Sequence, residues 1–454
     1  MSVRTRLARL AAAAAVALGA VGPGPAASET LGDALVFAYR NSNLLDQNQA
    51  VLRAADEGVA DAVAALRPVF SYVLQSGYAR TRQGEGTATT LDLETQLTLF
   101  DFGRNRLAIA IAKESVLAAR QALVSVEQGV LLDAVRAYMD VRQATENVAI
   151  NRNSVKVIGE ALRAAQDRFD VGEVTRTDVA LAEARLAAAR AGEVAADGQL
   201  AVAREAYRAA TGRYPGPLAA PPRQPRLPAS LDEARAIANR THPAILQAQH
   251  EVKAAELAVE LAAAQRLPSV GLAGTVSTDG GDTTGSVGLR MTQTIYAGGA
   301  LSSAHRRAIA NRDRARAALL QASVSVAQQV GNAWAGIDVA RAQIEAADRQ
   351  IKAATVAYNG VREEAQLGAR TTLDVLDAEQ ELLDAQANRI SADASLQVAI
   401  YSLLAATGLL TAERLNLGIP TYDPAAYYDA VKTAPVTSVQ GRSLDRVLKA
   451  IGKD

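Results

Sequence analysis

Two aspartates spaced three residues apart, Asp374 and Asp377, are the strongest candidates for functional chemistry in this sequence. They follow the segment GARTT, where a predicted turn gives way to a predicted helix, and residues three apart on a helix share a face. A pair of carboxylates on one face is a candidate for contact with cations. Acidic residues near the start of a helix also interact favourably with the helix dipole, and the residues alone leave both interpretations open.

Enzymatic chemistry finds no support in the sequence. The three histidines, His242, His250 and His305, do not have the spacing of metal ligands, and His242 before Pro243 is predicted to mark a helix start. The sequence contains no Gly-Lys-Ser/Thr loop for phosphate, so any process that needs energy must obtain it from elsewhere. It also contains no cysteine, which excludes disulfides, thiolate metal sites and a lipidated cysteine. We therefore predict no catalytic residue, no metal site and no cofactor.

Composition narrows the possible partners. The chain has 454 residues, of which 49% are hydrophobic, so it can bury a large core. Its 48 basic residues balance 48 acidic residues, so it lacks the broad positive field that attracts phosphate backbones. This balance argues against nucleic acid as a partner.

The first residues have the pattern of an export signal. Arg4, Arg6 and Arg9 precede an apolar run over residues 10–21, and small residues around Ala27 offer a cleavage site. A membrane anchor is the alternative, but about a dozen apolar residues fall short of the roughly 20 that a spanning helix needs. We predict a signal peptide over residues 1–28 and a mature chain that starts near Ser28 or Glu29.

An internal repeat organises the rest of the chain. SLDEA at Ser230 resembles TLGDA at Thr30, and TIYAGG at Thr294 resembles TLFDFG at Thr98. The segment AATG occurs at Ala209 and again at Ala405. We predict tandem copies over residues 29–212 and 230–408, a proline-rich extended connector over 213–229 and a polar tail over 409–454. Both copies are expected to form one structural domain. Each copy is predicted to contain, in this order, a helix, two strands, a very long helix and a further helix.

Alternating apolar residues predict two strands in each copy. The pattern begins at Val69 and at Leu91 in the first copy, and it runs from Val287 to Ile295 in the second. The Gly- and Thr-rich segments 84–90 and 277–285 are predicted turns. Strands of roughly ten residues can cross an outer membrane at a tilt, although hairpins packed on a soluble core are the alternative. The predicted lipid-facing residues are Phe70, Tyr72, Leu91, Leu93, Leu97, Val287, Leu289 and Met291.

Four strands cannot close a barrel, and an open sheet edge is not tolerated in lipid. Oligomerisation must therefore supply closure, and three protomers would bring twelve strands. Seven-residue repeats predict very long helices over residues 104–169 and 301–367, which no proline interrupts. At 1.5 Å per residue, each would span on the order of 100 Å. Alanine at alternate seam positions suits a thin-walled tube.

The chain resembles the TolC family of outer-membrane export ducts across nearly its whole mature length. The resemblance rests on TLFDFGR and TIYAGGA at the strand-to-helix junctions, and on RFDVGEVTRTDVALAEARL and GARTTLDVLDAEQELLDA at the helical turns. It implies a mainly α fold with a membrane β-barrel: a homotrimer with twelve strands in one barrel and coiled-coil helices forming a periplasmic tunnel. It also implies location in the outer membrane of a Gram-negative bacterium, in contact with lipid.

The same resemblance assigns roles to the residues at the helical turns. Asp374 and Asp377 match residues that line the periplasmic aperture, where threefold symmetry would make a ring that favours cations and could bind a blocking divalent ion. Arg370 matches the basic member of a closure link, and Thr177 and Asp178 match its partners. Two departures, Ala365 in place of an aromatic residue and Ala164 in place of a polar one, predict weaker or differently built closure.

The implied function is a passive conduit that opens when a periplasmic adaptor (a membrane fusion protein) and an inner-membrane exporter engage the helical tips. The exporter would be an ABC exporter or a proton-driven pump. The sequence LLAATGLLTAERLNLGIPTYDP looks most like the subgroup for type I protein secretion. Multidrug or metal efflux is the alternative within this class. A periplasmic adaptor or a coiled-coil scaffold is the alternative of another class.

Overall fold

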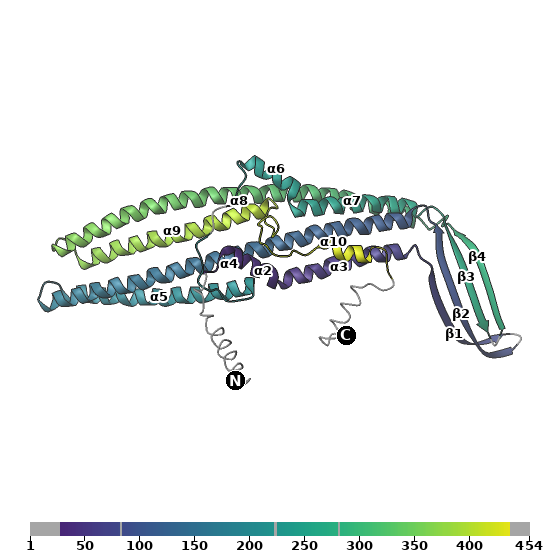
Figure 1. Ribbon diagram of the computed structural model, residues 1–454, viewed down its shortest axis with the longest axis horizontal. Helices are drawn as coiled ribbons and strands as arrows, with labels where there is room; N and C mark the ends of the chain where they lie inside the picture. The colour runs from purple at the N-terminus through teal and green to yellow at the C-terminus, as the bar shows by residue number, and fades with distance from the viewer. Residues whose placement is uncertain (1–27, 82–83, 222–224, 280–281, 436–454) are drawn as a thin grey trace, which may run out of the picture. The chain divides into compact units, whose positions relative to one another are not determined.

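The computed structural model describes residues 28–81, 84–221, 225–279 and 282–435, and Figure 1 shows its elements. In chain order they are α2 (Leu31–Asn41), α3 (Asn43–Ala64), β1 (Val69–Thr81), β2 (Gly84–Phe100), α4 (Arg104–Asp170), α5 (Arg176–Thr211), α6 (Leu231–Thr241), α7 (Pro243–Ala264), β3 (Ser269–Asp279), β4 (Asp282–Thr292), α8 (Ala300–Gln366), α9 (Thr372–Ala406) and α10 (Pro424–Val431). The order helix, helix, strand, strand, long helix, helix occurs twice. The predicted tandem repeat is confirmed.

Each copy begins with two helices where the sequence predicted one. The chain becomes extended at Ser42 between α2 and α3 and at His242 between α6 and α7. Pro243 then occupies the first turn of α7, where its missing N–H costs nothing, and Nδ1 of His242 accepts a hydrogen bond from the N–H of Ala244 at 3.2 Å. His242 therefore has the boundary role that the sequence predicted.

The four strands form one antiparallel sheet in the order β1-β2-β3-β4. The strands are longer than predicted, because residues 84–90 belong to β2 and pair with β1, and because β3 and β4 extend through most of the second predicted turn. β4 ends at Thr292, so Ile295 lies beyond the strand to which the alternating pattern assigned it. Hydrogen-bonded pairing between strands overrides the turn preference of glycine and threonine here.

The long helices α4 and α8 have 67 residues each, close to their predicted bounds. At 1.5 Å per residue this is about 100 Å of helix. The apolar residues that recur at seven-residue spacing form a seam along each helix and are largely buried, among them Val141, Ala144 and Val148 in α4 and Ile337 and Ala340 in α8. Phe169, at the end of its seam, is exposed. No helix within the described residues combines the length and apolar character needed to cross a membrane.

The described chain divides into two compact units, and each contains segments of both copies. The first contains residues up to Ser42 together with Val130–Leu227 and Ala335–Ser402. The second contains Asn43–Gly129, Pro228–Trp334 and the residues from Leu403 onward.

Glu29 anchors the start of the first unit. Its buried carboxylate accepts hydrogen bonds from the Tyr207 hydroxyl at 2.5 Å, from Arg213 at 3.2 Å and from the backbone N–H of Gly216 at 3.1 Å. The chain start is thereby joined to α5 and to the proline-rich connector. Of the predicted signal peptide, residues 1–27 lie outside the described residues.

In the second unit, α10 packs against α3. Leu52, Val59 and Val116 form an apolar cluster there, against which Tyr422 and Tyr428 pack. The guanidinium of Arg120 lies 5.3 Å from the centre of the Tyr428 ring, a cation–π contact. The polar tail therefore includes a short helix that contributes to the core of this unit.

Candidate functional site

The two helical turns that contain the predicted aperture and closure residues are built alike. Gly172 follows α4 and Gly368 follows α8, and both have a positive φ, of 80° and 78°, in the left-handed region that glycine adopts without strain. In each turn the glycine N–H donates to the backbone carbonyl of the third residue before it. The N–H of the residue after the glycine donates to the backbone carbonyl of the fifth residue before it. This is the usual C-terminal cap of a helix ended by glycine.

A capping box follows each turn and fixes one aspartate of each helix. In α5, the backbone N–H and the hydroxyl of Thr175 donate to Asp178 at 2.9 and 2.8 Å. In α9, the same two groups of Thr371 donate to Asp374, both at 2.9 Å. Hydrogen bonds from the threonine hold the pKa of each carboxyl below its usual value. The helix-start role that the sequence left open for Asp374 is therefore its local structural role.

Asp377 has a different partner from Asp374. Its carboxylate accepts a hydrogen bond from the Arg185 guanidinium at 2.7 Å, and this ion pair joins α9 to α5. The two aspartates therefore do not act as an equivalent pair within one chain. Arg185 was not among the residues that the sequence singled out, because an ion pair between residues 192 positions apart leaves no local pattern.

The predicted closure residues make local contacts in this single chain. Nε of Arg370 donates to Glu364 at 2.9 Å across its own turn, and this hydrogen bond raises the pKa of Arg370. Asp178 is held by Thr175, and Thr177 is exposed. The structure does not bring Arg370 together with Thr177 or Asp178, and their link stays a prediction for the assembled protein.

The two residues that depart from the family pattern differ in exposure. Ala365 is buried near the end of α8, whereas Ala164 is exposed on α4.

Glu379 is a buried carboxylate that is absent from the site residues predicted from the sequence. It lies on α9 with 5% of its surface exposed, and its Oε2 atom has no hydrogen-bond partner among the described residues. Burial raises its pKa to about 7; burial also raises the pKa of Tyr358 on α8, and the charge of Glu379 adds to that effect. An acidic residue placed between Leu376 and Leu383 at seam spacing was the signal that could have revealed it.

The sheet has one apolar and one polar face. Register places Tyr72 opposite Leu93, Leu93 opposite Val276, and Leu272 opposite both Leu97 and Leu289, so these residues share one face. Asp92, Glu94, Ser277 and Arg290 belong to the other face. All eight predicted lipid-facing residues lie on the apolar face: Phe70, Tyr72, Leu91, Leu93, Leu97, Val287, Leu289 and Met291. Each of them except Leu97, which is half-buried, is exposed.

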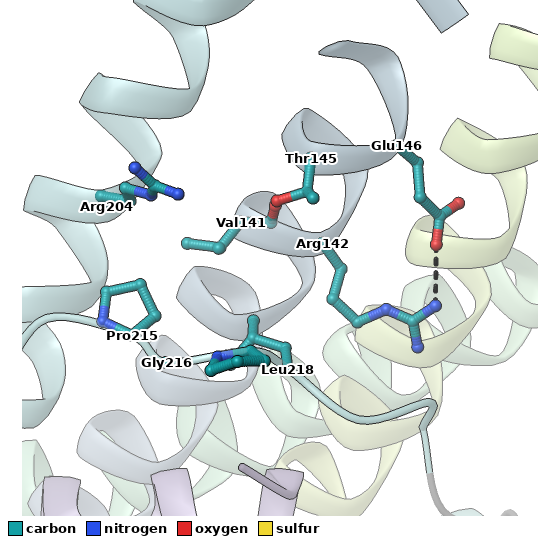
Figure 2. Close-up of a pocket in the computed structure, with 9 residues that line it drawn as sticks. Val141, Arg142, Thr145, Glu146, Arg204, Pro215, Gly216 and Leu218 are labelled. Atoms are coloured by element: carbon teal, nitrogen blue, oxygen red, sulfur yellow. Dashed lines mark hydrogen bonds and ion pairs between the residues drawn. The ribbon is translucent and has the colours of Figure 1, made fainter. Parts of the chain in front are cut away.

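A surface pocket of about 440 Å³ lies between α4, α5 and the connector in the first unit (Figure 2). Arg142 donates to Glu146 at 2.8 Å on one side, and Arg204 extends from α5 on the other. Pro215 and Leu218 contribute apolar lining. None of the predicted site residues lines this pocket. Its residues form no group of nucleophile and base, so we assign it no chemistry.

Two very long helices, shorter partner helices and a sheet with an exposed apolar face define the class of outer-membrane channel subunits. The chain belongs to the outer membrane efflux protein family, whose model matches residues 36–213 and 235–409. It is 38% identical over 434 residues to the outer membrane efflux protein BepC of Brucella suis, covering 93% of this chain and 95% of that protein.

Other relatives agree with this assignment. The outer membrane protein TolC of Vibrio cholerae is 25% identical, covering 79% of this chain and 86% of that protein. The alkaline protease secretion protein AprF of Pseudomonas aeruginosa is 27% identical, covering 68% and 66%. A crystal structure of CusC shares the fold with a TM-score of 0.76 at 19% identity, covering 86% of this chain and 95% of that one.

These comparisons confirm the predicted TolC-like family, fold class and location. The protein is an outer-membrane efflux or secretion channel with its helical part in the periplasm. Because channels of this family are passive conduits, it is not an enzyme.

Proposed function

We propose that this protein is the exit duct of a tripartite export system and that it acts as a homotrimer. The observation that carries the proposal is the four-stranded sheet, whose apolar face is exposed and whose outer strands, β1 and β4, have no further partner among the described strands. An unpaired strand edge in lipid leaves backbone N–H and C=O groups unsatisfied. Two further copies would pair these edges and close a barrel of twelve strands.

Pore formation tests this proposal directly. The mature protein, purified in mild detergent, is expected to have the mass of a trimer by light scattering and to produce discrete conductance steps in planar bilayers. A monomeric protein that forms no pores in detergent or in native membranes would overturn the proposal.

We infer that the cargo is a secreted protein, as in type I secretion, delivered by an inner-membrane ABC exporter through a periplasmic adaptor. The name of AprF, which assigns that relative to secretion of an alkaline protease, supports this inference. The name of the outer membrane efflux protein BepC favours efflux, which remains the second candidate function, with drugs or metal ions as cargo and a proton-driven pump as the exporter. The channel holds no energy source of its own in either case.

Deletion of the gene in its native host distinguishes the two candidates. Secretion predicts that specific proteins disappear from the culture medium and return on complementation, while sensitivity to drugs and metal ions changes little. Efflux predicts increased sensitivity with an unchanged set of secreted proteins. Crosslinking in native membranes would then identify the adaptor and the exporter that co-purify.

The aperture and its closure form a separate part of the proposal. We propose that Asp374 and Asp377 lie at the periplasmic aperture and that Arg370, with Thr177 and Asp178, links neighbouring turns in the closed trimer. Arg370→Ala is expected to raise single-channel conductance, because it removes the cation of the link. Glu364→Gln serves as a matched control, because it breaks the contact of Arg370 within its own turn and leaves the link available. An unchanged closed-state conductance for Arg370→Ala would contradict the link.

A further inference from the structure

The ion pair between Arg185 and Asp377 connects two helical hairpins near their turns. Arg185 lies on α5 of the first hairpin and Asp377 on α9 of the second, and the guanidinium and carboxylate are 2.7 Å apart. The residues next to them, Leu186 and Leu376, pack with Ile158 in one apolar cluster. This cluster fixes the register of the two helices, so the ion pair forms between positions that packing already holds together.

The face of α9 that meets α5 is acidic. A groove of about 290 Å³ between α4, α5 and α9 is lined by Asp384, Gln380 and Leu383 of α9, and Asp377 is related to Asp384 by seven residues and so shares this face. Among the described residues that line the groove, Arg185 is the only cation. Removal of Arg185 would therefore leave Asp377 and Asp384 on this face without a balancing cation.

We propose that Arg185 determines the ion preference of the aperture by neutralising Asp377. The inference rests on the proposed aperture. Asp374 accepts hydrogen bonds from Thr371, and the nearby Arg370 is itself ion-paired with Glu364 at 2.9 Å, whereas Asp377 has an ion pair of its own with Arg185. A close ion pair has little field beyond a few ångströms compared with a lone charge. Each protomer thus contributes one effective negative charge to the ring, and not two.

Because the ion pair is exposed to solvent, a substitution in it can change the ion preference of the aperture. The side chains of Arg185 and Asp377 are 47% and 56% exposed, so a carboxylate that lost its partner would be accessible to passing ions. Three such carboxylates in a trimer would form a second acidic ring, and rings of carboxylates favour cations.

Planar-bilayer recordings test the proposal with four variants, and a fifth, Asp374→Asn, tests the aperture itself. Arg185→Gln should increase the permeability of potassium relative to chloride, and it should lower the concentration of hexaamminecobalt(III) that blocks the channel by on the order of tenfold. Asp377→Asn should have the opposite effect on permeability, because it frees three arginines. The double variant Arg185→Gln/Asp377→Asn should return close to wild type, because both charges are removed together. The control is Arg190→Gln, which removes an exposed cation of the same helix that has no ion-pair partner in the described structure.

The outcomes separate this inference from the proposed aperture. If Arg185→Gln behaves like Arg190→Gln while Asp374→Asn reduces cation preference, the aperture stands and the role of Arg185 is wrong. If Asp374→Asn and every other variant leave permeability and block unchanged, the aperture itself is misplaced. Trimer mass in detergent, measured for each variant, shows that a changed permeability does not come from misassembly.

Discussion

Glu379 shows how a single buried carboxylate can make the stability of the periplasmic helices depend on pH. Glu379 lies in the contact surface of α9 at a position where the spacing calls for an apolar residue, and it has an unsatisfied oxygen. An ionised carboxylate in such a place loses hydration that no partner replaces. The protonated form is therefore favoured in the folded protein, and the pKa of Glu379 rises from its usual value to about 7.

Glu379→Gln should remove one source of pH-dependent stability. The folded pKa lies above the unfolded value, so the contribution of Glu379 to the free energy of unfolding is highest below about pH 4.5 and falls between pH 4.5 and 7 as the unfolded chain releases its proton first. The glutamine variant should lack this fall and be more stable at pH 8, by roughly 2 to 3 kcal/mol per protomer. Thermal unfolding in detergent at pH 5 and pH 8 measures the difference.

The matched control for this prediction is Glu381→Gln. Glu381 is two residues away on the same helix and is exposed, so the change should leave the pH dependence of unfolding as it is in the wild type. A pH dependence that is identical in the Glu379→Gln variant and the wild type would show that Glu379 is hydrated in the protein.

At the level of elements, the two copies repeat a specific contact at the ends of their helices. The Asn41 side chain donates to the carbonyl of Thr211 at 2.8 Å, and the Thr241 hydroxyl donates to the carbonyl of Thr407 at 2.7 Å. Gly212 follows Thr211 and Gly408 follows Thr407, and both glycines have a positive φ. The end of α2 or α6 is thereby joined to the end of α5 or α9, and the helix break at Ser42 and His242 positions the donor.

Gly408→Ala should destabilise the protein more than the same change in an open turn. A Cβ at Gly408 would collide with the backbone carbonyl of Thr241, and its φ of 75° strains any residue with a side chain. Gly368→Ala is the control, because its φ is 78° and nothing lies near its added Cβ. We expect a loss of about 1 to 2 kcal/mol for Gly368→Ala and of more than that for Gly408→Ala. Equal losses in urea unfolding would show that the contact with Thr241 opens at little cost.

For the whole molecule, the two-faced sheet is the feature on which assembly in a membrane depends. Seven of the eight predicted lipid-facing side chains are exposed in the single chain, and large exposed apolar patches are unusual in soluble proteins. A lipid environment on that face, with the polar face toward the interior of a closed assembly, would account for both faces.

Leu289→Lys should therefore lower the amount of trimer in the outer membrane, whereas Ser286→Lys on the opposite face should not. A lysine on the lipid side of a barrel costs about 2 to 4 kcal/mol near the membrane midplane and less near its surfaces. Density-gradient fractionation with detection of the trimer measures the effect. Equal membrane yields for both variants would contradict the assigned face.

Much of this architecture is determined by local sequence patterns. Alternation at Tyr72, Leu93 and Leu289 places these residues on one face, because the side-chain period of a strand is two. Seven-residue spacing gives the extent of α4 and α8 to within a residue or two, because a seam needs only the positions along one helix. The repeated segments establish two copies of one unit before any coordinates are known.

Only the tertiary structure decided which side chains meet. The pairing of Asp377 with Arg185, the burial of Glu379 and the contact of Thr241 with Thr407 join residues far apart in the chain or place a charge in a contact surface. Periodicity indicates which face of a helix a residue occupies. It does not indicate which helix packs against that face or the axial register between the two helices. Those two quantities follow from the packing of clusters such as Ile158, Leu186 and Leu376, and they determine which of two similar aspartates forms an ion pair with Arg185.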